Sequence, residues 1–318
     1  SVLLLDIARA FDTVNHVRLL DNLRKKRIPG WFVQTIKSFL TDRTTTLLVD
    51  GKETVPRQLV AGVPQGSPLS PILFLFYNAP LLEAVYRPEL PILPLGFADD
   101  VNLLSYGQST ATTCANLELA HEQCLDWART HGIRFALDKY KLIHFTRRQG
   151  FDLQAPVRLQ NATIKPEPVV RILGLQVDSK LNWKAQGQAV QAKMSTQMLA
   201  LQRTTASTWG ATMPKARQIY QAVVRSAMSY GAAVWHQPSS KPKGLAAKLQ
   251  KQQTQGLRIV LGAFKATSAR RLEVESYVPP LDLWLNGRIA RFQARLEKSG
   301  LAQKIRDACS AIQTRILR

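Results

Sequence analysis

Residues 94–104, PLGFADDVNLL, place two adjacent carboxylates between two apolar runs. This pattern predicts a β-hairpin whose tight turn carries Asp99 and Asp100 out of the sheet. Neighbouring carboxylates disfavour each other's ionisation, so the pair is costly unless a cation or an arginine lies on it. A metal ion is therefore the natural partner of this turn. Acidic turn residues are also common for backbone reasons alone, so the pair by itself leaves a structural role open.

The charge of the chain is strongly asymmetric. The 318 residues are enough for two domains or subdomains, and they carry a net charge of +21. Residues 1–100 hold 11 Lys and Arg against 10 Asp and Glu, and the remaining residues hold 32 against 12. Between Asp178 and Glu273 there is no acidic residue. Because a merely solvated surface usually mixes both signs, the second half of the chain indicates binding to a polyanion such as nucleic acid.

Three cysteines, Cys114, Cys124 and Cys309, form neither a C-x-x-C pair nor a disulfide framework, which predicts a reduced, intracellular setting. His121, Cys124 and His131 could be imagined as zinc ligands. Their spacing matches no metal motif, so buried structural side chains are the favoured interpretation. The sequence contains no run of about 18 apolar residues, so no membrane span is predicted. The chain begins inside an apolar strand without a methionine or a signal peptide, so we expect a fragment.

The order of the expected elements indicates an α+β fold that continues into helices. Apolar periodicity predicts strands at residues 2–5, 135–145 and 171–177, the last interrupted by Gly174, hairpins at 44–60 and 94–104, and helices at 17–27, 31–40, 72–86, 112–131, 189–203, 214–230, 245–261 and 282–296. The first part predicts a small antiparallel sheet covered on one face by helices. We place the boundary near residues 180–186, which divides the chain into residues 1–182 and 183–318.

A loop rich in glycine and proline, AGVPQGSPLSP at residues 61–71, leads into the helix expected at 72–86. Such a loop lets backbone and small side chains approach a ligand closely. A well-capped helix start, with Ser70 ahead of Pro71, is the structural alternative.

Three carboxylates are expected to converge at one end of the sheet. Asp6 ends the first strand, and the hairpin that carries Asp99 and Asp100 could pair beside it. Such a set suits two divalent ions roughly 3.5 to 4 Å apart, an arrangement that activates an attacking hydroxyl and stabilises a leaving pyrophosphate. Hard oxygen ligands completed by substrate phosphates are typical of Mg²⁺, with Mn²⁺ as an alternative.

Three segments stand in the order and type of motifs A, B and C of reverse transcriptases: Asp6 with Phe11, residues 62–71, and FADD at residues 97–100. The sequence most resembles the reverse transcriptases of non-LTR, LINE-like retrotransposons, and its C-terminal half is similar to their fungal branch. Residues 135–145 are similar to motif D, residues 171–181 to the motif E primer grip, and residues 230–236 and 257–262 to the thumb and the segment after it. The resemblance spans nearly the whole chain.

The resemblance implies a polymerase palm over residues 1–182, with motifs A to E, and a mostly α-helical thumb with a basic C-terminal extension over residues 183–318. It implies that Asp6, Asp99 and Asp100 bind two metal ions, with the backbone carbonyl of Ile7 as a further ligand. The other implied contacts are Phe11 beneath the sugar, Gln65 and Gly66 against template and incoming nucleotide, Lys139 near the triphosphate as a proton donor, and Leu173 and Gly174 in the primer grip. Phe11 could instead pack in the core, Lys141 is an alternative to Lys139, and Asp12 is expected to be structural.

The implied activity is RNA-directed DNA polymerisation, in which the 3′-hydroxyl of a primer attacks a dNTP. The implied partners are an RNA template, a DNA primer and dNTPs, with work in the nucleus during integration and no membrane. Reverse transcriptases have basic fingers upstream of motif A, and because the printed residues begin at motif A we expect a fragment without fingers, an endonuclease domain or an RNase H domain. A catalytically inactive nucleic-acid-binding remnant is therefore the second hypothesis. An RNA-dependent RNA polymerase or a group II intron-type maturase shares the palm, but Phe11 in the sugar position argues against RNA synthesis.

Overall fold

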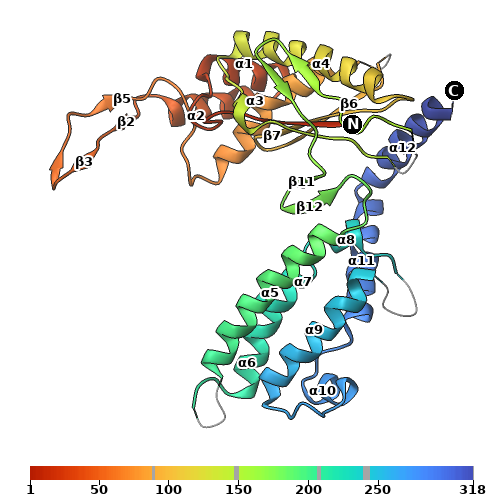
Figure 1. Ribbon diagram of the computed structural model, residues 1–318. Helices are drawn as coiled ribbons and strands as arrows, with labels where there is room; N and C mark the ends of the chain where they lie inside the picture. Colours follow the sequence, from red (N-terminus) through yellow and green to blue (C-terminus); the bar gives the residue numbers. More distant parts are fainter. Residues whose placement is uncertain (88–89, 147–149, 206–208, 239–243, 318) are drawn as a thin grey trace. The chain divides into compact units, whose positions relative to one another are not determined.

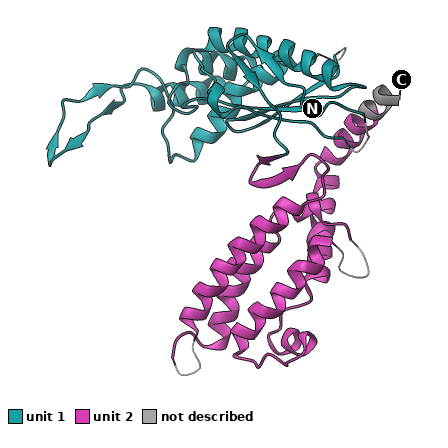
Figure 2. Cartoon of the chain, viewed as in Figure 1, with its two compact units in different colours: residues 1–168, 312–318 teal, residues 169–311 magenta. Residues whose placement is uncertain are grey.

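The computed structural model describes residues 1–87, 90–146, 150–205, 209–238 and 244–317, and side chains up to residue 310. Its contacts divide the chain into two compact units, residues 1–168 with 312–318, and residues 169–311 (Figure 2). Small antiparallel sheets and many helices make it a mixed fold of the α+β kind that the sequence predicts. Among the residues described, no helix combines the length and apolar character needed to cross a membrane.

A four-stranded antiparallel sheet forms the centre of the first unit. Its strand order is β6-β7-β1-β8, with β1 at Val2–Asp6, β6 at Ile92–Phe97, β7 at Asp100–Ser105 and β8 at Lys141–Ile143. Because side chains alternate between the two faces of a strand, Leu3 and Leu5 of β1 share a buried face with Val101 and Leu103 of β7. The helices α3 (Leu69–Val85) and α4 (Thr110–His131) pack against the sheet, and α1 (His16–Lys25) and α2 (Gly30–Leu40) pack beside α3 and α1 respectively (Figure 1).

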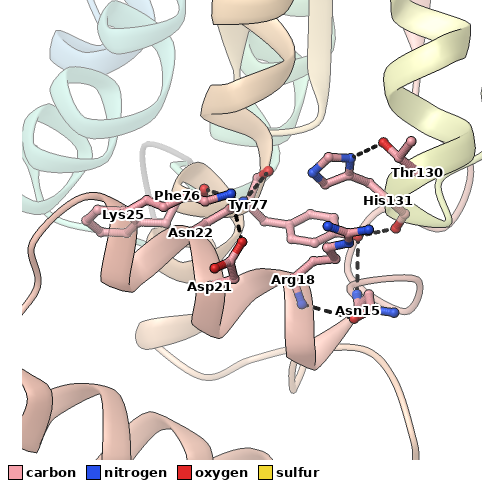
Figure 3. A network of polar contacts seen from close by, with 9 residues as sticks. All are labelled: Asn15, Arg18, Asp21, Asn22, Lys25, Phe76, Tyr77, Thr130 and His131. Carbon is pink, nitrogen blue, oxygen red and sulfur yellow. Dashed lines mark hydrogen bonds and ion pairs between the residues drawn. The ribbon is translucent and has the colours of Figure 1, made fainter.

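A buried tyrosine ties three of these helices together. Tyr77 of α3 is fully buried; its hydroxyl donates to the carbonyl of His131 at the end of α4 and accepts from the backbone N–H of Asn15, 3.3 Å away (Figure 3). Asn15 also caps α1 by accepting from the backbone N–H of Arg18 at 3.0 Å. Asn22 of α1 donates to the carbonyls of Phe76 and Tyr77. Buried polar groups of α1, α3 and α4 are therefore hydrogen-bonded across the helix layer.

A single hairpin, interrupted along its length, follows α2. The strands β2 (Thr44–Thr45) and β5 (Arg57–Gln58) pair, as do β3 (Leu48–Val49) and β4 (Lys52–Glu53). The turn between β3 and β4 is the Asp50-Gly51 pair, with φ of +50° and +76°. Two consecutive left-handed residues are typical of a two-residue hairpin turn, which confirms the hairpin predicted here.

The strand predicted at residues 135–145 is wrong over most of its length. A 3₁₀ turn, η1 (Leu137–Lys139), precedes the short β8. The backbone N–H of Ala136 donates to the carbonyl of Asp6, and Ile7 forms an isolated bridge with Phe135, so β1 already fixes the chain before the turn. Sequence alternation alone could not indicate that β1 fixes the chain at this point.

The strand predicted at residues 171–177 is also wrong, because it is a hairpin. The strands β11 (Val169–Ile172) and β12 (Leu175–Asp178) pair across a turn at Leu173 and Gly174, with φ of +45° and +84°. Four further elements have no counterpart among the predicted ones: the hairpin of β9 (Val157–Leu159) and β10 (Ala162–Ile164) and the helices α10 (Ala269–Glu275) and α12 (Leu301–Leu317).

The rest of the second unit is helical. Its further helices are α5 (Lys184–Thr204), α6 (Met213–Ile219), the π-helical turn η2 (Tyr220–Arg225), α7 (Ser226–Met228), α8 (Ala232–Trp235), α9 (Gly244–Leu261) and α11 (Leu281–Lys298). Tyr220 and Met228 lie fully buried in its apolar core with Leu249 and Leu257 of α9. The contact division falls at residues 168 and 169, before the hairpin β11–β12, because β12 packs against α5.

Two glycines within helices of this unit have opposite surroundings. A Cβ built at Gly256 of α9 lies 2.5 Å from the Tyr220 ring, whereas one at Gly287 of α11 meets nothing within 4 Å. We expect Gly256→Ala to lower the free energy of unfolding of this unit by about 1–3 kcal/mol, because the buried ring must move. Gly287→Ala is expected to raise it by up to about 1 kcal/mol through helix propensity. Thermal or urea unfolding followed by circular dichroism measures both, and a stabilising Gly256→Ala would contradict this packing.

Candidate active site

The end of β1 and the turn between β6 and β7 lie together. Asp6 is the direct cross-strand partner of Asp100 in the antiparallel pairing of β1 with β7. Directly opposed residues of such a pair point to the same face of the sheet. Since Leu5 and Val101, their neighbours along the strands, lie buried in the core, Asp6 and Asp100 lie on the opposite face. Two carboxylates far apart in the sequence thus share one face of one sheet end.

The turn itself consists of Ala98 and Asp99, and Asp100 already begins β7. The predicted placement of both aspartates in the turn is therefore wrong by one residue. Ala98 adopts a φ of +53°, which is unfavourable for a residue with a Cβ. Asn78 of α3 donates from its side-chain amide to the Ala98 carbonyl at 3.2 Å. This bond ties the turn to the helix layer.

Asn78 is a positioning residue that the sequence analysis missed. It is 97% buried, one of few polar residues in an otherwise apolar helix. The sequence offered one signal for it: a polar residue within the apolar stretch 69–85. A buried amide needs a hydrogen-bond partner, so such a residue indicates a specific contact. The identity of the partner depends on how α3 crosses the sheet.

Burial and neighbouring like charges both raise the cost of ionising Asp100. Burial raises the pKa of the Asp100 carboxyl, and the nearby charges of Asp99 and Asp6 raise it further. Lys139 of η1 lies against Asp6, with its ammonium nitrogen 2.9 Å from Oδ2. The hydrogen bond to Asp6 raises the pKa of Lys139. One of the carboxylates therefore has a cation beside it within the chain.

The two candidate lysines differ in their partners. Lys139 lies at the carboxylates, whereas the Lys141 ammonium lies 3.2 Å from Glu167. The geometry favours Lys139 as the amine of this site. Its position on a 3₁₀ turn, rather than in the predicted strand, points it toward the end of β1.

The Gly- and Pro-rich loop is clamped onto the segment after β1. The backbone N–H of Val63 donates to the Phe11 carbonyl at 2.8 Å, and the N–H of Gly62 donates to the carbonyl of Val14. Gly62 has a φ of +87°, and a Cβ there would lie 2.9 Å from the Asp12 carbonyl. Only glycine fits this close approach. The Gln65 amide donates to the Asp12 carboxylate at 3.0 Å, which supports the structural role expected for Asp12.

Phe11 lies in the segment after β1, and Gly66 lies in the loop packed against that segment. The Phe11 ring is partly buried and lies 5.2 Å from the Phe74 ring of α3. A partly exposed ring is compatible both with core packing and with contact to a ligand. Gly66 has a φ of +87° beside Gln65.

Leu173 and Gly174 belong to the second unit. Tyr230 donates from its hydroxyl to the Leu173 carbonyl at 2.7 Å, and its ring lies 3.2 Å from a Cβ built at Gly174. The turn between β11 and β12 is therefore held by the segment that follows α7.

Of the residues considered as zinc ligands, His121 and Cys124 are buried in the first unit, and His131 is partly buried. His121 Nε2 lies 3.1 Å from the Tyr140 hydroxyl, and burial lowers the pKa of His121 to about 4. Cys124 is fully buried, and His131 stacks on Trp127 with ring centroids 4.1 Å apart. Each has the apolar or hydrogen-bonded surroundings of a structural side chain.

Within the described part of the chain, no three or more His, Cys, Asp or Glu side chains are placed close enough together to hold a metal ion, and this includes Asp6, Asp99 and Asp100. The carboxylates of Asp6, Asp99 and Asp100 are an open set on one sheet end. The donors are carboxylate oxygens, the ligand type that Mg²⁺ prefers, so the chemistry of these side chains, though not a metal-holding arrangement, is present at this sheet end.

Residues 1–177 match the family model described as reverse transcriptase (RNA-dependent DNA polymerase). The chain belongs to this family. This reverse transcriptase chain is similar to the RNA-directed DNA polymerase from mobile element jockey of Drosophila melanogaster, with 27% identity over 95% of this chain and 33% of the relative. It is also similar to the Pol polyprotein of the type-1 retrotransposable element R2 of Popillia japonica, with 39% identity over 36% of this chain and 21% of that protein.

These relatives are proteins of non-LTR retrotransposons, which confirms the LINE-like resemblance, while the fungal branch stays a prediction. The reverse transcriptase chain spans about a third or less of their lengths. Among solved structures, it is similar to telomerase from Candida albicans in complex with a fragment of telomeric RNA, with a TM-score of 0.45, 12% identity and coverage of 83% of this chain and 48% of that one. A TM-score of this size does not establish a shared arrangement.

We expect Asp100→Asn to stabilise the first unit at pH 7 in the absence of divalent ions. Because the folded pKa of Asp100 is raised, its ionisation destabilises the fold as pH rises, and this cost is absent below about pH 4, where the carboxyl is protonated in both states. Removing the like charge should raise the melting temperature by about 1–3 °C at pH 7, and by less as the pH falls.

The control is Asp126→Asn on α4, whose carboxylate is exposed and pairs with Arg129. This change should not raise the melting temperature. Adding Mg²⁺ should stabilise the wild-type chain more than Asp100→Asn. If Asp100→Asn melts at a lower temperature than the wild type at pH 7 without Mg²⁺, ionised Asp100 does not destabilise the fold.

Proposed function

We propose that the chain is the palm and thumb of an RNA-directed DNA polymerase that extends a primer by transfer of nucleotides from dNTPs. The observation that carries the proposal is the pairing of Asp6 with Asp100 beside Asp99, on the sheet face opposite the core, in a chain of the reverse transcriptase family. The proposed palm covers residues 1–182 and the proposed thumb residues 183–318. The relatives named as RNA-directed DNA polymerases support this activity.

Asp6, Asp99 and Asp100 would hold two divalent ions, Mg²⁺ or Mn²⁺, with the Ile7 carbonyl as a further oxygen. When bound, such ions neutralise phosphate charge and favour in-line attack by the primer hydroxyl. The chain itself supplies the fixed positions of the carboxylates, through the register of β1 with β7 and the hydrogen bond from Asn78. Lys139 would leave Asp6 for the triphosphate, where its ammonium can stabilise negative charge and donate a proton.

The other proposed contacts are to the sugar, the template, the incoming nucleotide and the primer. Phe11 would exclude a 2′-hydroxyl from beneath the sugar, while Gln65 and Gly66 would contact the template and the incoming nucleotide. Leu173 and Gly174, in the hairpin turn held by Tyr230, would grip the primer. The RNA template is proposed from the names of the relatives, and the excess of Lys and Arg after residue 178 supports a polyanionic partner. Copying into a genome would place this work in the nucleus.

Primer extension on an RNA template tests the carboxylates. We expect the wild-type chain to add dNTPs in Mg²⁺, and Asp99→Asn with Asp100→Asn to lower the rate by at least about a thousandfold, because the charge that holds the ions is lost. Asp126→Asn is the matched control and should extend like the wild type. Extension by the double variant at the wild-type rate would show that these carboxylates do not hold the ions.

The second hypothesis, an inactive nucleic-acid-binding remnant, predicts a different result. The wild-type chain would then bind RNA and DNA with strong salt dependence, indifferent to Mg²⁺, and would add no nucleotide. Absence of extension by the folded wild-type chain therefore overturns the polymerase activity of this chain.

Phe11 is tested by its effect on sugar choice. If its ring excludes the 2′-hydroxyl, Phe11→Ala should raise the ratio of NTP to dNTP incorporation by at least about tenfold, since removing a side chain from such a contact changes discrimination by a few kcal/mol. Phe74→Leu, which alters the packing partner of Phe11 but not the proposed contact, is the control. Lower thermal stability with an unchanged ratio would mean that Phe11 serves packing alone.

A further inference from the structure

The second unit contains a pocket of about 800 Å³. Basic side chains line one of its walls, and glycine and small side chains line the other. Residues of α11 supply the basic wall, and residues just before and at the start of α8 supply the other. The helices α8 and α11 lie side by side (Figure 1). The lining residues are Ser229, Gly231, Ala232, Ala233, Arg288, Ile289, Arg291, Phe292, Ala294, Arg295 and Lys298. They include four cations and no acid.

The four cations form one stripe along the helix. Arg288, Arg291, Arg295 and Lys298 are spaced by three and four residues, so they share a face of α11. The acidic residue Glu297 lies about 180° around the helix from Arg288, at 100° per residue. The stripe therefore concentrates positive charge at the pocket rather than mixing both signs as a merely solvated helix face does.

The first cation of the stripe is held in place by an aromatic ring. The guanidinium of Arg288 lies 5.1 Å from the Trp284 ring centroid, and that of Arg225 lies 4.3 Å from it. Arg225 is 96% buried and donates to the Pro279 carbonyl at 2.8 Å. The buried Arg225 thus holds the Trp284 ring in place, and the ring in turn orders Arg288. Because Arg288 is already ordered, it would lose less conformational entropy on binding a ligand.

An exposed aromatic side chain lies among these cations. Phe292 lines the pocket and is 40% exposed, next along the helix to Arg291. Positive charge that follows a backbone, together with an aromatic face for stacking, is the combination by which proteins bind single-stranded nucleic acid. The small side chains opposite leave room for a base.

We propose that this pocket binds a short single-stranded segment of nucleic acid, with its phosphates on the α11 stripe and a base on Phe292. The stripe runs from Arg288 to Lys298, ten steps of 1.5 Å or about 15 Å along the helix, which matches about four nucleotides of a stacked strand at an axial rise of 3.4 Å each. A pocket of this volume has the size of a small-ligand site and does not enclose a duplex. The proposal rests on the proposed function only for the class of its ligand, since phosphates and base faces are common to RNA and DNA.

The test is binding of the full chain to labelled oligonucleotides by fluorescence anisotropy over a range of NaCl concentrations, without dNTPs or divalent ions. The probes are one single-stranded RNA, the DNA of the same sequence and a blunt DNA duplex. We expect Arg291→Gln with Arg295→Gln to weaken single-strand binding by at least about tenfold and to lower the salt slope by about 1.4, because two phosphate contacts are lost. Phe292→Ala should weaken single-strand binding by at least about fivefold and leave duplex binding unchanged.

The matched control is Arg270→Gln with Arg271→Gln on α10, which removes the same charge from exposed positions outside the pocket. If this pair weakens binding as much as the Arg291 and Arg295 pair, or if Phe292→Ala weakens single-strand and duplex binding equally, the pocket is not the site. If the Arg291 and Arg295 pair is needed for binding, a difference in affinity between the RNA and the DNA probe identifies which strand the pocket prefers, and equal affinity shows that it accepts both. Because the assay contains no substrate for extension, its failure leaves the polymerase proposal standing, and failure of extension leaves the pocket standing.

Discussion

The register of β1 against β7 is the constraint on which the first unit depends. Leu3 and Leu5 face the core with Leu103 and Val101, and the same register sets Asp6 opposite Asp100 on the other face. A slip of one residue would exchange the two faces, burying Asp6 and exposing leucine. The apolar burial that stabilises the sheet thus fixes the carboxylates beside each other, although each raises the cost of ionising its neighbour.

The surrounding elements only partly relieve that electrostatic cost. Lys139 lies beside Asp6, and Asn78 holds the Ala98 carbonyl, but the charges of Asp99 and Asp6 still raise the pKa of Asp100. A left-handed alanine in the same turn adds backbone strain. Local conflicts of this kind are expected where a site is kept ready for a ligand, because a sequence optimised for stability alone would remove them. A cation bound between the carboxylates would relieve the repulsion.

The second unit is built by a different rule. Its helices bury Tyr220, Met228 and Leu257, and they carry positive charge with no acidic residue between Asp178 and Glu273. The buried ring of Tyr220 packs directly against Gly256, where no side chain occupies the space. The close packing of this core thus depends on a large residue beside the smallest one. With the core closed in this way, basic and aromatic side chains are left on the surface, where Arg288 and Phe292 line the same pocket.

The sequence by itself determined eight of the helical segments, the hairpins at residues 44–60 and 94–104, the three motifs and the location of the positive charge. These follow from local periodicity and from residue types at fixed spacings, which need no knowledge of distant contacts. The same reasoning placed the turn one residue too late at Asp99 and Asp100, and it missed the hairpin at Leu173 and Gly174. Turn positions depend on backbone angles that apolar patterns do not encode.

Only the tertiary structure decided which distant residues meet. Lys139 rather than Lys141 lies against Asp6 because β1 fixes the chain before the 3₁₀ turn, and Gln65 meets Asp12 because Gly62 allows the loop to approach the backbone of Phe11 and Asp12. Asn78 was visible in the sequence only as a polar residue in an apolar helix, and its partner Ala98 is set by how α3 crosses the sheet. Contacts between segments far apart in the chain depend on the packing of whole elements, so no local pattern could have identified them.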